Sequence, residues 1–169
     1  MGLNNTEEYQ KALEAAFRLL GFKMRTEQEL TQRLSQKGFS PEVVQAVIKR
    51  LQELDYLNDT TFVENYIKSK SKTVGIRRLQ YDLTKKGINK DEVEQGLTQW
   101  YTQEQELAAA CALVDKLWRQ AEKKNNFQED RELKIKETRR IVNKLLMRGF
   151  SYNAAEAALR QKKLADLCD

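Results

Sequence analysis

Apolar residues recur three or four positions apart along most of the chain, which is the spacing of one face of an α-helix. Ala12, Ala16, Leu19 and Leu20 form the first such stripe. A single proline and seven glycines leave long stretches without helix breakers, which also favours helix over strand. The pattern predicts an all-α fold of nine helices, over residues 6–22, 27–37, 41–55, 60–72, 76–86, 90–100, 103–124, 130–148 and 152–166.

One short motif, Leu-x-x-Lys/Arg-Gly-Phe/Ile, occurs three times, around Gly38, Gly87 and Gly149. A glycine directly after a helix accepts the left-handed conformation that ends it, and the next apolar residue packs back on the leucine, as in a Schellman motif. The residues two positions after the glycines are polar and suited to cap the next helix: Ser40, Asn89 and Ser151. Each motif therefore predicts a helix, a tight turn and a second helix.

A further helix precedes each of these pairs, so the chain is predicted to consist of three tandem three-helix repeats. Their boundaries are predicted at residues 1–58, 59–101 and 102–169. Repeat 3 is the longest, and a charged polar loop between longer helices is expected near residues 119–136. A single unit of about 50 residues buries too little surface alone. Stacking is therefore predicted, giving an elongated, curved array that uses a face rather than a pocket.

Positive charge is concentrated in the second and third repeats. The net charge is +5, but residues 68–90 contain eight lysines and arginines against one acid, Asp82. A second basic stretch runs from Lys134 to Arg148. Such stretches suit a polyanion or an acidic face of a protein partner.

Arginine pairs stand ten and nine residues before the glycine in repeats 2 and 3, where repeat 1 has Gln28 and Glu29. A solvated helix face and a binding face both fit such residues, but the matched pairing and the scarcity of nearby acid support binding. The predicted surface contacts to a partner or to DNA phosphates are Arg77, Arg78, Lys85, Lys86, Arg139, Arg140 and Arg148, followed by Arg25 and Arg33.

The composition argues against an enzyme, a metalloprotein or a membrane protein. The chain has no histidine, the commonest general base and metal ligand. It has no phosphate-binding loop, dinucleotide fingerprint or metal-ligand cluster, so no cofactor and no small-molecule substrate are predicted. Cys111 and Cys168 form no motif, and no apolar run reaches about 18 residues, so a reduced, cytoplasmic location is expected.

Direct reading of DNA sequence is weighed and disfavoured. Residues 29–48 have the spacing of a helix–turn–helix motif. However, the helices that would enter a groove, 41–55 and 90–100, carry several acids, so weak attraction to phosphates is the better prediction. Trp100 and Trp118 could stack on bases, but their helical spacing favours a core role.

Four longer motifs follow one another between residues 10 and 162. In chain order they are Arg25-Thr26-x-x-Glu29-Leu30-x3-Leu34-x-x-Lys37-Gly38-Phe39, Leu57-Asn58-Asp59-x-x-Phe62-Val63-x-x-Tyr66, Gly75-x-x-Arg78-Leu79-x-x-Asp82-Leu83-x-x-Lys86-Gly87-Ile88 and Lys144-Leu145-x-x-Arg148-Gly149-Phe150-Ser151-Tyr152. Each motif is modest, but their order and spacing together are specific. The set resembles the RecX family of regulatory proteins.

This resemblance implies a modulator of the RecA recombinase. Such proteins resemble curved arrays of three-helix units that lodge in the groove of the RecA–DNA filament. They depress its ATP hydrolysis, strand exchange and co-protease function in DNA repair and the SOS response. Asp55 departs from the family's usual glycine and puts the shape of the first inter-repeat turn in question, while Lys70 keeps the charge of a common arginine. A stand-alone nucleic-acid binder and a helical adaptor for another acidic partner are the alternatives.

Overall fold

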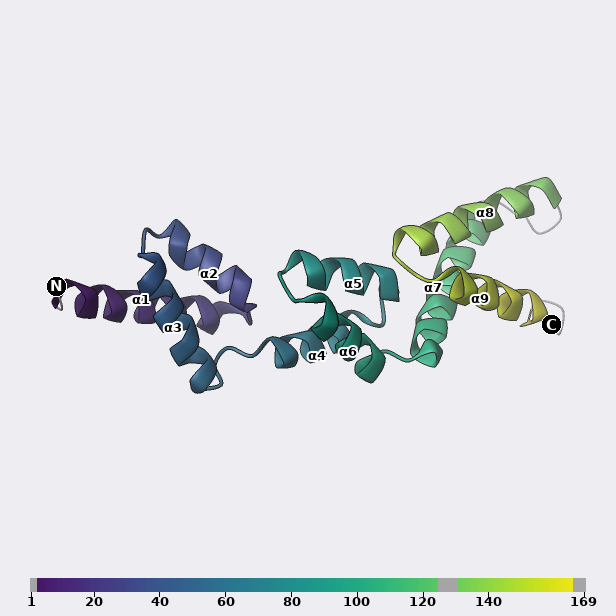
Figure 1. The fold of residues 1–169 in the computed structure, drawn as a ribbon. Helices are drawn as coiled ribbons and strands as arrows, with labels where there is room; N and C mark the ends of the chain where they lie inside the picture. The colour runs from purple at the N-terminus through teal and green to yellow at the C-terminus, as the bar shows by residue number, and fades with distance from the viewer. Residues whose placement is uncertain (1–2, 125–130, 166–169) are drawn as a thin grey trace. The chain divides into compact units, whose positions relative to one another are not determined.

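A computed structural model of the chain describes the backbone of residues 3–124 and 131–165 (Figure 1). Over those ranges it contains nine α-helices and no strand, which confirms the predicted all-α fold of repeated three-helix units. The helices are α1 Leu3–Phe22, α2 Glu27–Gln36, α3 Pro41–Glu53, α4 Asp59–Lys70, α5 Ile76–Lys85, α6 Lys90–Trp100, α7 Gln103–Lys124, α8 Arg131–Met147 and α9 Tyr152–Ala165. The middle of the loop predicted near 119–136 lies outside the described residues.

The three glycine turns are Schellman motifs, as predicted. Gly38, Gly87 and Gly149 have φ values of 88°, 89° and 81°. In each turn the N–H after the glycine donates to the leucine carbonyl five residues earlier, at 3.5, 3.3 and 3.2 Å. A side chain with a Cβ is strained at such φ values, and this explains why glycine stands at all three positions.

Asp55 takes the same left-handed conformation without being a glycine. Its φ is 56°, and the N–H of Tyr56 donates to the carbonyl of Leu51 at 2.9 Å. Its carboxylate accepts a hydrogen bond from the side-chain amide of Asn58 at 3.0 Å, a local bond of the kind that lets aspartate occupy this region. The turn after α3 therefore keeps the Schellman shape despite the departure from glycine.

The predicted caps are confirmed at two of three positions. Asn89 accepts from the N–H of Glu92 at 2.8 Å, and the hydroxyl of Ser151 accepts from the N–H of Ala154 at 3.2 Å. Ser40 stands at the N-cap of α3 as predicted, but its side chain makes no capping bond to α3. The hydroxyl and N–H of Ser40 both donate to the carboxylate of Glu8 instead, at 3.2 and 2.7 Å.

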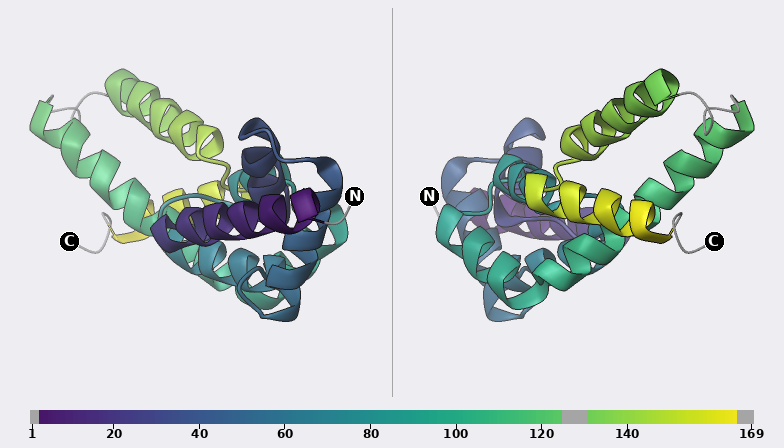
Figure 2. Two further views of the ribbon diagram at one scale, coloured as in Figure 1. Left: turned by 90° about the vertical axis from the view of Figure 1, so that its left-hand side faces the viewer. Right: turned by 90° about the vertical axis from the view of Figure 1, so that its right-hand side faces the viewer.

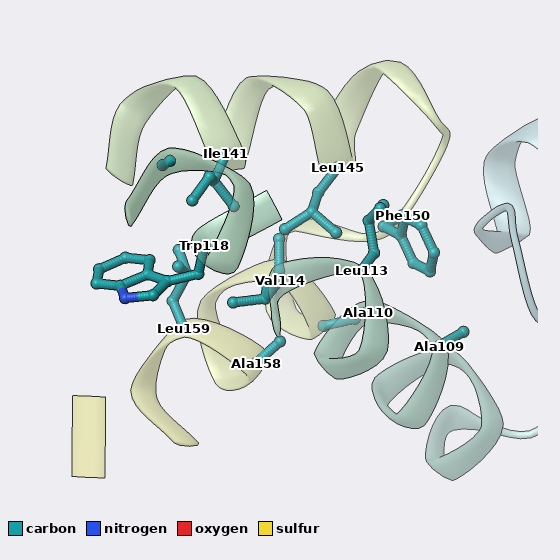
Figure 3. Packing of buried hydrophobic residues seen from close by; sticks show 13 residues of the cluster. Ala109, Ala110, Leu113, Val114, Trp118, Ile141, Leu145, Phe150, Ala158 and Leu159 are labelled. Carbon is teal, nitrogen blue, oxygen red and sulfur yellow. The ribbon is translucent and has the colours of Figure 1, made fainter. Parts of the chain in front are cut away.

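Separate apolar cores fill repeats 1 and 3. In repeat 1, α1, α2 and α3 bury leucine, valine and alanine side chains around Leu30, Leu34 and Leu51. In repeat 3, Trp118 and Phe150 are fully buried between α7, α8 and α9 (Figure 3). There α9 packs against α7 more extensively than α8 does (Figure 2). The alanines of α9 that face α7 permit this close approach, including Ala155 and Ala158.

The core prediction is right for Trp118 and wrong for Trp100. Trp118 has no exposed surface, whereas Trp100 is only partly buried. The ammonium of Lys68 lies 4.6 Å from the centroid of the Trp100 ring, as in a cation–π contact. Trp100 therefore belongs to the boundary between core and surface.

The chain divides into two compact bodies, and repeat 2 contributes to both. The N-terminal body comprises Met1–Asn65 and Leu83–Val93, and the C-terminal body comprises Tyr66–Asp82 and Glu94–Asp169. The turn between α5 and α6 thus belongs with repeat 1, and the first part of α5 belongs with repeat 3. Among the described helices, none is both long and apolar enough to cross a membrane.

Candidate binding surface

Within the N-terminal body, the turn of repeat 2 packs on the amino end of α2, a contact called junction 1 here. The hydroxyl of Thr26, the N-cap of α2, donates to the carbonyl of Lys86 at 2.6 Å. The next N–H, of Glu27, donates to the carboxylate of Asp59 at 2.9 Å. Gly87 leaves no space for a Cβ, because the side chain of Gln28 lies there. The unpaired N–H groups that every helix start exposes are thus partly satisfied by the following repeat.

The surroundings of Asp59 in junction 1 disfavour the negative charge of its carboxylate. Burial raises the pKa of its carboxyl, and nearby Glu27, Glu92 and Glu29 raise it further, while the hydrogen bond from the N–H of Glu27 lowers it. The net direction is upward, so the folded chain favours the protonated form of Asp59 more than the unfolded chain does.

Within the C-terminal body, the turn of repeat 3 packs in the same way on the amino end of α5, and this contact is called junction 2. The N–H of Gly75 donates to the carbonyl of Arg148, and that of Arg77 to the carbonyl of Gly149, both at 3.0 Å. The N–H of Ile76 donates to the carboxylate of Glu106 at 3.2 Å. Gly75 is required here because a Cβ would overlap the backbone of Phe150.

Glu106 joins two helix starts in junction 2. Only 6% of its surface is exposed, and its carboxylate also accepts from the N–H and the hydroxyl of Ser151, at 3.0 and 2.8 Å. A carboxylate at the positive ends of α5 and α9 is stabilised by the partial charges there. Nearby, the hydroxyl of Tyr101 donates to the carbonyl of Val74 at 3.2 Å. Burial, and secondarily Glu106, raises the pKa of Tyr101 strongly, so it stays protonated.

The two junctions differ in charge. In junction 1, Lys86 and Glu29 form an ion pair at 2.6 Å with side chains only 26% and 23% exposed. The equivalent positions in junction 2 hold Arg148 and Arg78, so no pair can form there. Arg78 pairs with Asp82 on its own helix instead, at 3.0 Å, and lies over the Tyr81 ring. Junction 2 therefore gathers three arginines where junction 1 is neutralised: Arg77, Arg78 and Arg148.

The predicted contact residues of repeats 2 and 3 differ in exposure and in whether they form an ion pair. Arg77, Arg139 and Arg148 are exposed, and their guanidinium groups make no hydrogen bond or ion pair with other described residues. Arg140 is half exposed and pairs with Glu137 at 3.3 Å, on the same helix as Arg139. Lys85 is exposed near the end of α5.

Three predicted contacts have partners within the N-terminal body: Lys86, Arg25 and Arg33. Lys86 is partly buried in the ion pair of junction 1, which corrects the expectation of an open surface cation. Arg25 is partly buried and donates to the carbonyl of Leu19 near the end of α1, at 3.1 Å. Arg33 is exposed and reaches the side chain of Gln36 at 3.4 Å. Glu29 attracts Lys86, and the carboxyl end of α1 attracts Arg25, because carboxylates and the carboxyl ends of helices carry negative charge.

The charges of the two bodies also differ. The C-terminal body contains 19 lysines and arginines against 13 aspartates and glutamates, a net of +6. The N-terminal body contains 11 against 12, a net of −1. The excess of positive charge therefore lies on the C-terminal body, which holds junction 2 and the arginines of α8. No group of three or more acidic or cysteine side chains suited to a metal ion exists among the described residues.

Sequence reasoning missed Asp59, Glu106 and Gly75 in the junctions, and Glu8 beside the turn of repeat 1. A signal was present, because Glu8 precedes Ser40 by 32 residues and Glu106 precedes Ser151 by 45. The difference of 13 equals the extra length of repeat 3 between the turn glycines, so the two glutamates occupy matching positions. Gly75 likewise precedes Gly87 by as many residues as Thr26 precedes Gly38.

Comparison with known proteins identifies the first two repeats. Residues 12–51 match the family model of the first three-helix domain of RecX, and residues 58–97 match that of the second. The chain is 33% identical to "Regulatory protein RecX" of Caldanaerobacter subterraneus subsp. tengcongensis over 92% of this chain and 72% of that one. It is 32% identical to the protein of the same name from Finegoldia magna, over 91% and 73%.

A solved structure shares the fold. The crystal structure of RecX from Lactobacillus salivarius matches with a TM-score of 0.79 at 23% identity, covering 94% of this chain and 99% of that chain. The overall fold of this chain is thus shared with a solved RecX structure. The chain belongs to the RecX family.

Proposed function

We propose that the chain binds the filament that the RecA recombinase forms on DNA, and restrains the ATP hydrolysis, strand exchange and co-protease activity of that filament. The observation that carries the proposal is the match to proteins named "Regulatory protein RecX" over 92% of the chain. The chain acts in this proposal as a cytoplasmic binding protein without catalysis of its own, in DNA repair and the SOS response.

Junction 2 is the proposed contact surface for the filament. Arg78 pairs with Asp82, but Arg77 and Arg148 have no ion-pair partner among the described residues, so junction 2 keeps positive charge for an anionic partner. Planar guanidinium groups bind carboxylates and phosphates with two hydrogen bonds at once. Acidic side chains of the filament protein and phosphates of its DNA are both suitable partners.

The DNA-dependent ATPase of RecA tests the proposal. Adding the wild-type chain to RecA on single-stranded DNA should lower the rate of ATP hydrolysis in a saturable way. An unchanged rate at saturating concentration would exclude the inhibitor role. Co-sedimentation of the chain with the filament should give a binding curve with the same midpoint, because inhibition is attributed to the bound form.

The double variant Arg77→Glu with Arg148→Glu tests the surface. Both side chains are exposed and lack partners among the described residues, so helicity should be unchanged. Half-maximal inhibition should require about tenfold more protein, the scale of one or two lost charged contacts. The matched control is Arg18→Glu with Lys49→Glu, an equal charge change on exposed positions of the N-terminal body. Equal loss in both variants would show a general charge effect only.

A stand-alone nucleic-acid binder is the second candidate function, and the clustering of three arginines at junction 2 favours it. Labelled single-stranded DNA without RecA should then bind at low salt, with affinity falling steeply as salt is added. The Arg77→Glu and Arg148→Glu variant should reduce the slope of log affinity against log salt by about 2. Absence of DNA binding at low salt excludes this candidate and leaves the filament proposal standing.

A further inference from the structure

The turn of repeat 1 matches the two turns that form junctions, yet no helix start lies against it in the described chain. A Cβ built on Gly38 would meet no atom within 4 Å, whereas one on Gly87 or Gly149 would strike a neighbouring helix start. Phe39 is partly exposed, while its counterparts Ile88 and Phe150 are buried. The repeat 1 turn is therefore an unused copy of a surface that the chain uses twice.

The acceptor groups of a junction are already assembled beside this turn. The carboxylate of Glu8 binds the N–H and hydroxyl of Ser40, as Glu106 binds those of Ser151. In junction 2 the same oxygen of Glu106 also accepts the N–H of Ile76 from the docked helix. Glu8 is partly exposed where Glu106 is buried, so its carboxylate remains accessible to a further donor.

The backbone acceptors of the turn are open as well. In junction 2 the carbonyls of Arg148 and Gly149 each accept an N–H from the start of α5. The matching carbonyls of Lys37 and Gly38 accept no hydrogen bond from the described residues. The turn and Glu8 together therefore present three acceptors in the arrangement that receives the first N–H groups of a helix.

We propose that this surface, formed by Glu8 and residues 37–40, docks the amino-terminal turn of a helix in a protein partner. The inference builds on the proposed function in taking the RecA filament as that partner. Junction 2 defines the geometry: the partner helix places its N-cap N–H on the carbonyl of Lys37, its first helical N–H on Glu8 and its second helical N–H on the carbonyl of Gly38. A small residue is needed at the N-cap, as Gly75 shows in junction 2.

Charge specifies the partner helix further. Lys37 is exposed and corresponds to Lys86, which pairs with Glu29 three residues after the N-cap Thr26. A matching partner helix therefore begins with serine, threonine or glycine followed three residues later by aspartate or glutamate. A carboxylate at that place also suits the positive end of its own helix, so one acid would stabilise both the partner helix and the contact.

A second copy of the chain is a poorer occupant. Position 137 of repeat 3 corresponds to Thr26 and Gly75, counted back from the turn glycine. Glu137 lies inside α8, six residues after Arg131, where backbone N–H groups are committed to the helix. The third repeat thus lacks an equivalent helix start at the position a stacked copy would need.

Filament binding of three variants tests the proposal. Gly38→Asn keeps a residue that tolerates the left-handed conformation but fills the open space, and Lys37→Glu reverses the charge. Each should weaken binding to RecA filaments on single-stranded DNA about tenfold. Gly21→Asn, at another glycine with nothing within 4 Å, is the matched control and should bind like wild type. Circular dichroism confirms folding, and Lys37→Glu serves alone if Gly38→Asn unfolds.

A photoreactive p-benzoylphenylalanine placed at position 37 identifies the occupant. The expected adduct joins it to the first turn of a RecA helix with the predicted N-cap and acid. Wild-type affinity in both Gly38→Asn and Lys37→Glu, or an adduct to a helix interior or to a second copy of the chain, would overturn the inference while leaving filament binding intact. Failure of the wild-type chain to bind filaments would overturn both this inference and the proposed function.

Discussion

Junctions 1 and 2 share one pattern of backbone hydrogen bonds but differ in the charges of their side chains. Each sets a Schellman turn of one repeat on the amino end of the second helix of the repeat before it, with a carboxylate accepting the first N–H. Junction 1 adds an ion pair between Lys86 and Glu29, whereas junction 2 has arginines at both equivalent positions. Backbone hydrogen bonds therefore hold the junction, and side-chain charge is left to vary.

That difference distinguishes the backbone bonds that hold a junction together from the side-chain charges that are free to bind a partner. In both junctions, carbonyls and a carboxylate accept hydrogen bonds from the start of the docked helix. The side chains nine and ten positions before the glycine take no part in these shared bonds. In junction 1 the residue nine positions before the glycine, Glu29, pairs with Lys86. In junction 2 Arg78 pairs within its own helix, and Arg77 has no ion-pair partner among the described residues. The following substitutions test whether the backbone bonds of a junction and its side-chain charges contribute independently to stability and binding.

Gly75→Ala should have the largest effect. The added methyl would overlap the backbone of Phe150, which cannot move without opening the repeat 3 core. We expect a loss of about 2 to 3 kcal/mol in unfolding free energy, measured by urea denaturation. Gly21→Ala is the control, since its site on α1 is open. Equal stability of the two variants would show that junction 2 is looser than its hydrogen bonds indicate.

Glu106→Gln should rank second. The amide keeps the shape but loses charge at two helix starts, and its NH₂ group faces N–H donors that need acceptors. A loss of about 2 kcal/mol is expected, whereas Glu8→Gln, at a partly exposed site with one fewer N–H donor, should cost less. The comparison uses urea denaturation of both variants, and a greater cost at Glu8 would contradict the assigned roles.

Exchanging the charges of the junctions should have smaller, opposite effects. Glu29→Arg breaks the partly buried pair with Lys86 and places two cations together, so stability should fall by about 1 to 2 kcal/mol. Arg148→Glu relieves the repulsion in junction 2, so stability should hold or rise slightly while filament inhibition weakens. Thermal melts measure the change in stability, and the RecA ATPase measures the change in filament inhibition. Reduced stability in Arg148→Glu would mean that the arginine cluster is structural.

Asp59→Asn should have the smallest effect, visible chiefly as a change in pH dependence. The pKa of Asp59 is raised in the folded chain, so the folded state binds the proton more tightly than the unfolded state. Asp59 therefore adds stability as pH falls from neutral through its raised pKa, and this addition disappears as pH rises. Asn can still accept from the N–H of Glu27. The variant should be slightly more stable than wild type at neutral pH, and lowering the pH should stabilise it less. Urea denaturation across pH measures both effects. An unchanged pH profile of the unfolding free energy would argue against the raised pKa.

The sequence was sufficient to predict the helices, the turns and the repeat. Apolar spacing and the Leu-x-x-Lys/Arg-Gly-Phe/Ile motif depend on contacts within a few residues, and helix ends near Gly38, Gly87 and Gly149 followed from them. The same reasoning placed Ser40 at the N-cap of α3 but did not predict the bonding of its side chain, because its partner Glu8 lies 32 residues away. It was also wrong about Lys86 as an open cation, because Glu29 lies in the preceding repeat.

For the candidate site, the sequence identified arginine pairs but not their surroundings. Arg77 and Arg148 come together only because backbone N–H groups of α5 bond to the turn after α8, more than 70 residues further along the chain. Arg139 and Arg140 hold equivalent sequence positions, but no following repeat docks on α8 in the described chain, and Arg140 pairs with Glu137. Sequence equivalence therefore did not guarantee equivalent environments.

The sequence by itself determined local structure, since helix formation and Schellman termination depend on neighbours along the chain. It also determined the family, through the order of its motifs. Only the tertiary structure decided which charges are neutralised, which glycines meet another backbone and which turn is left undocked. Those properties depend on how one repeat meets the next, and distant residues meet only after each three-helix unit has folded and presented its helix starts.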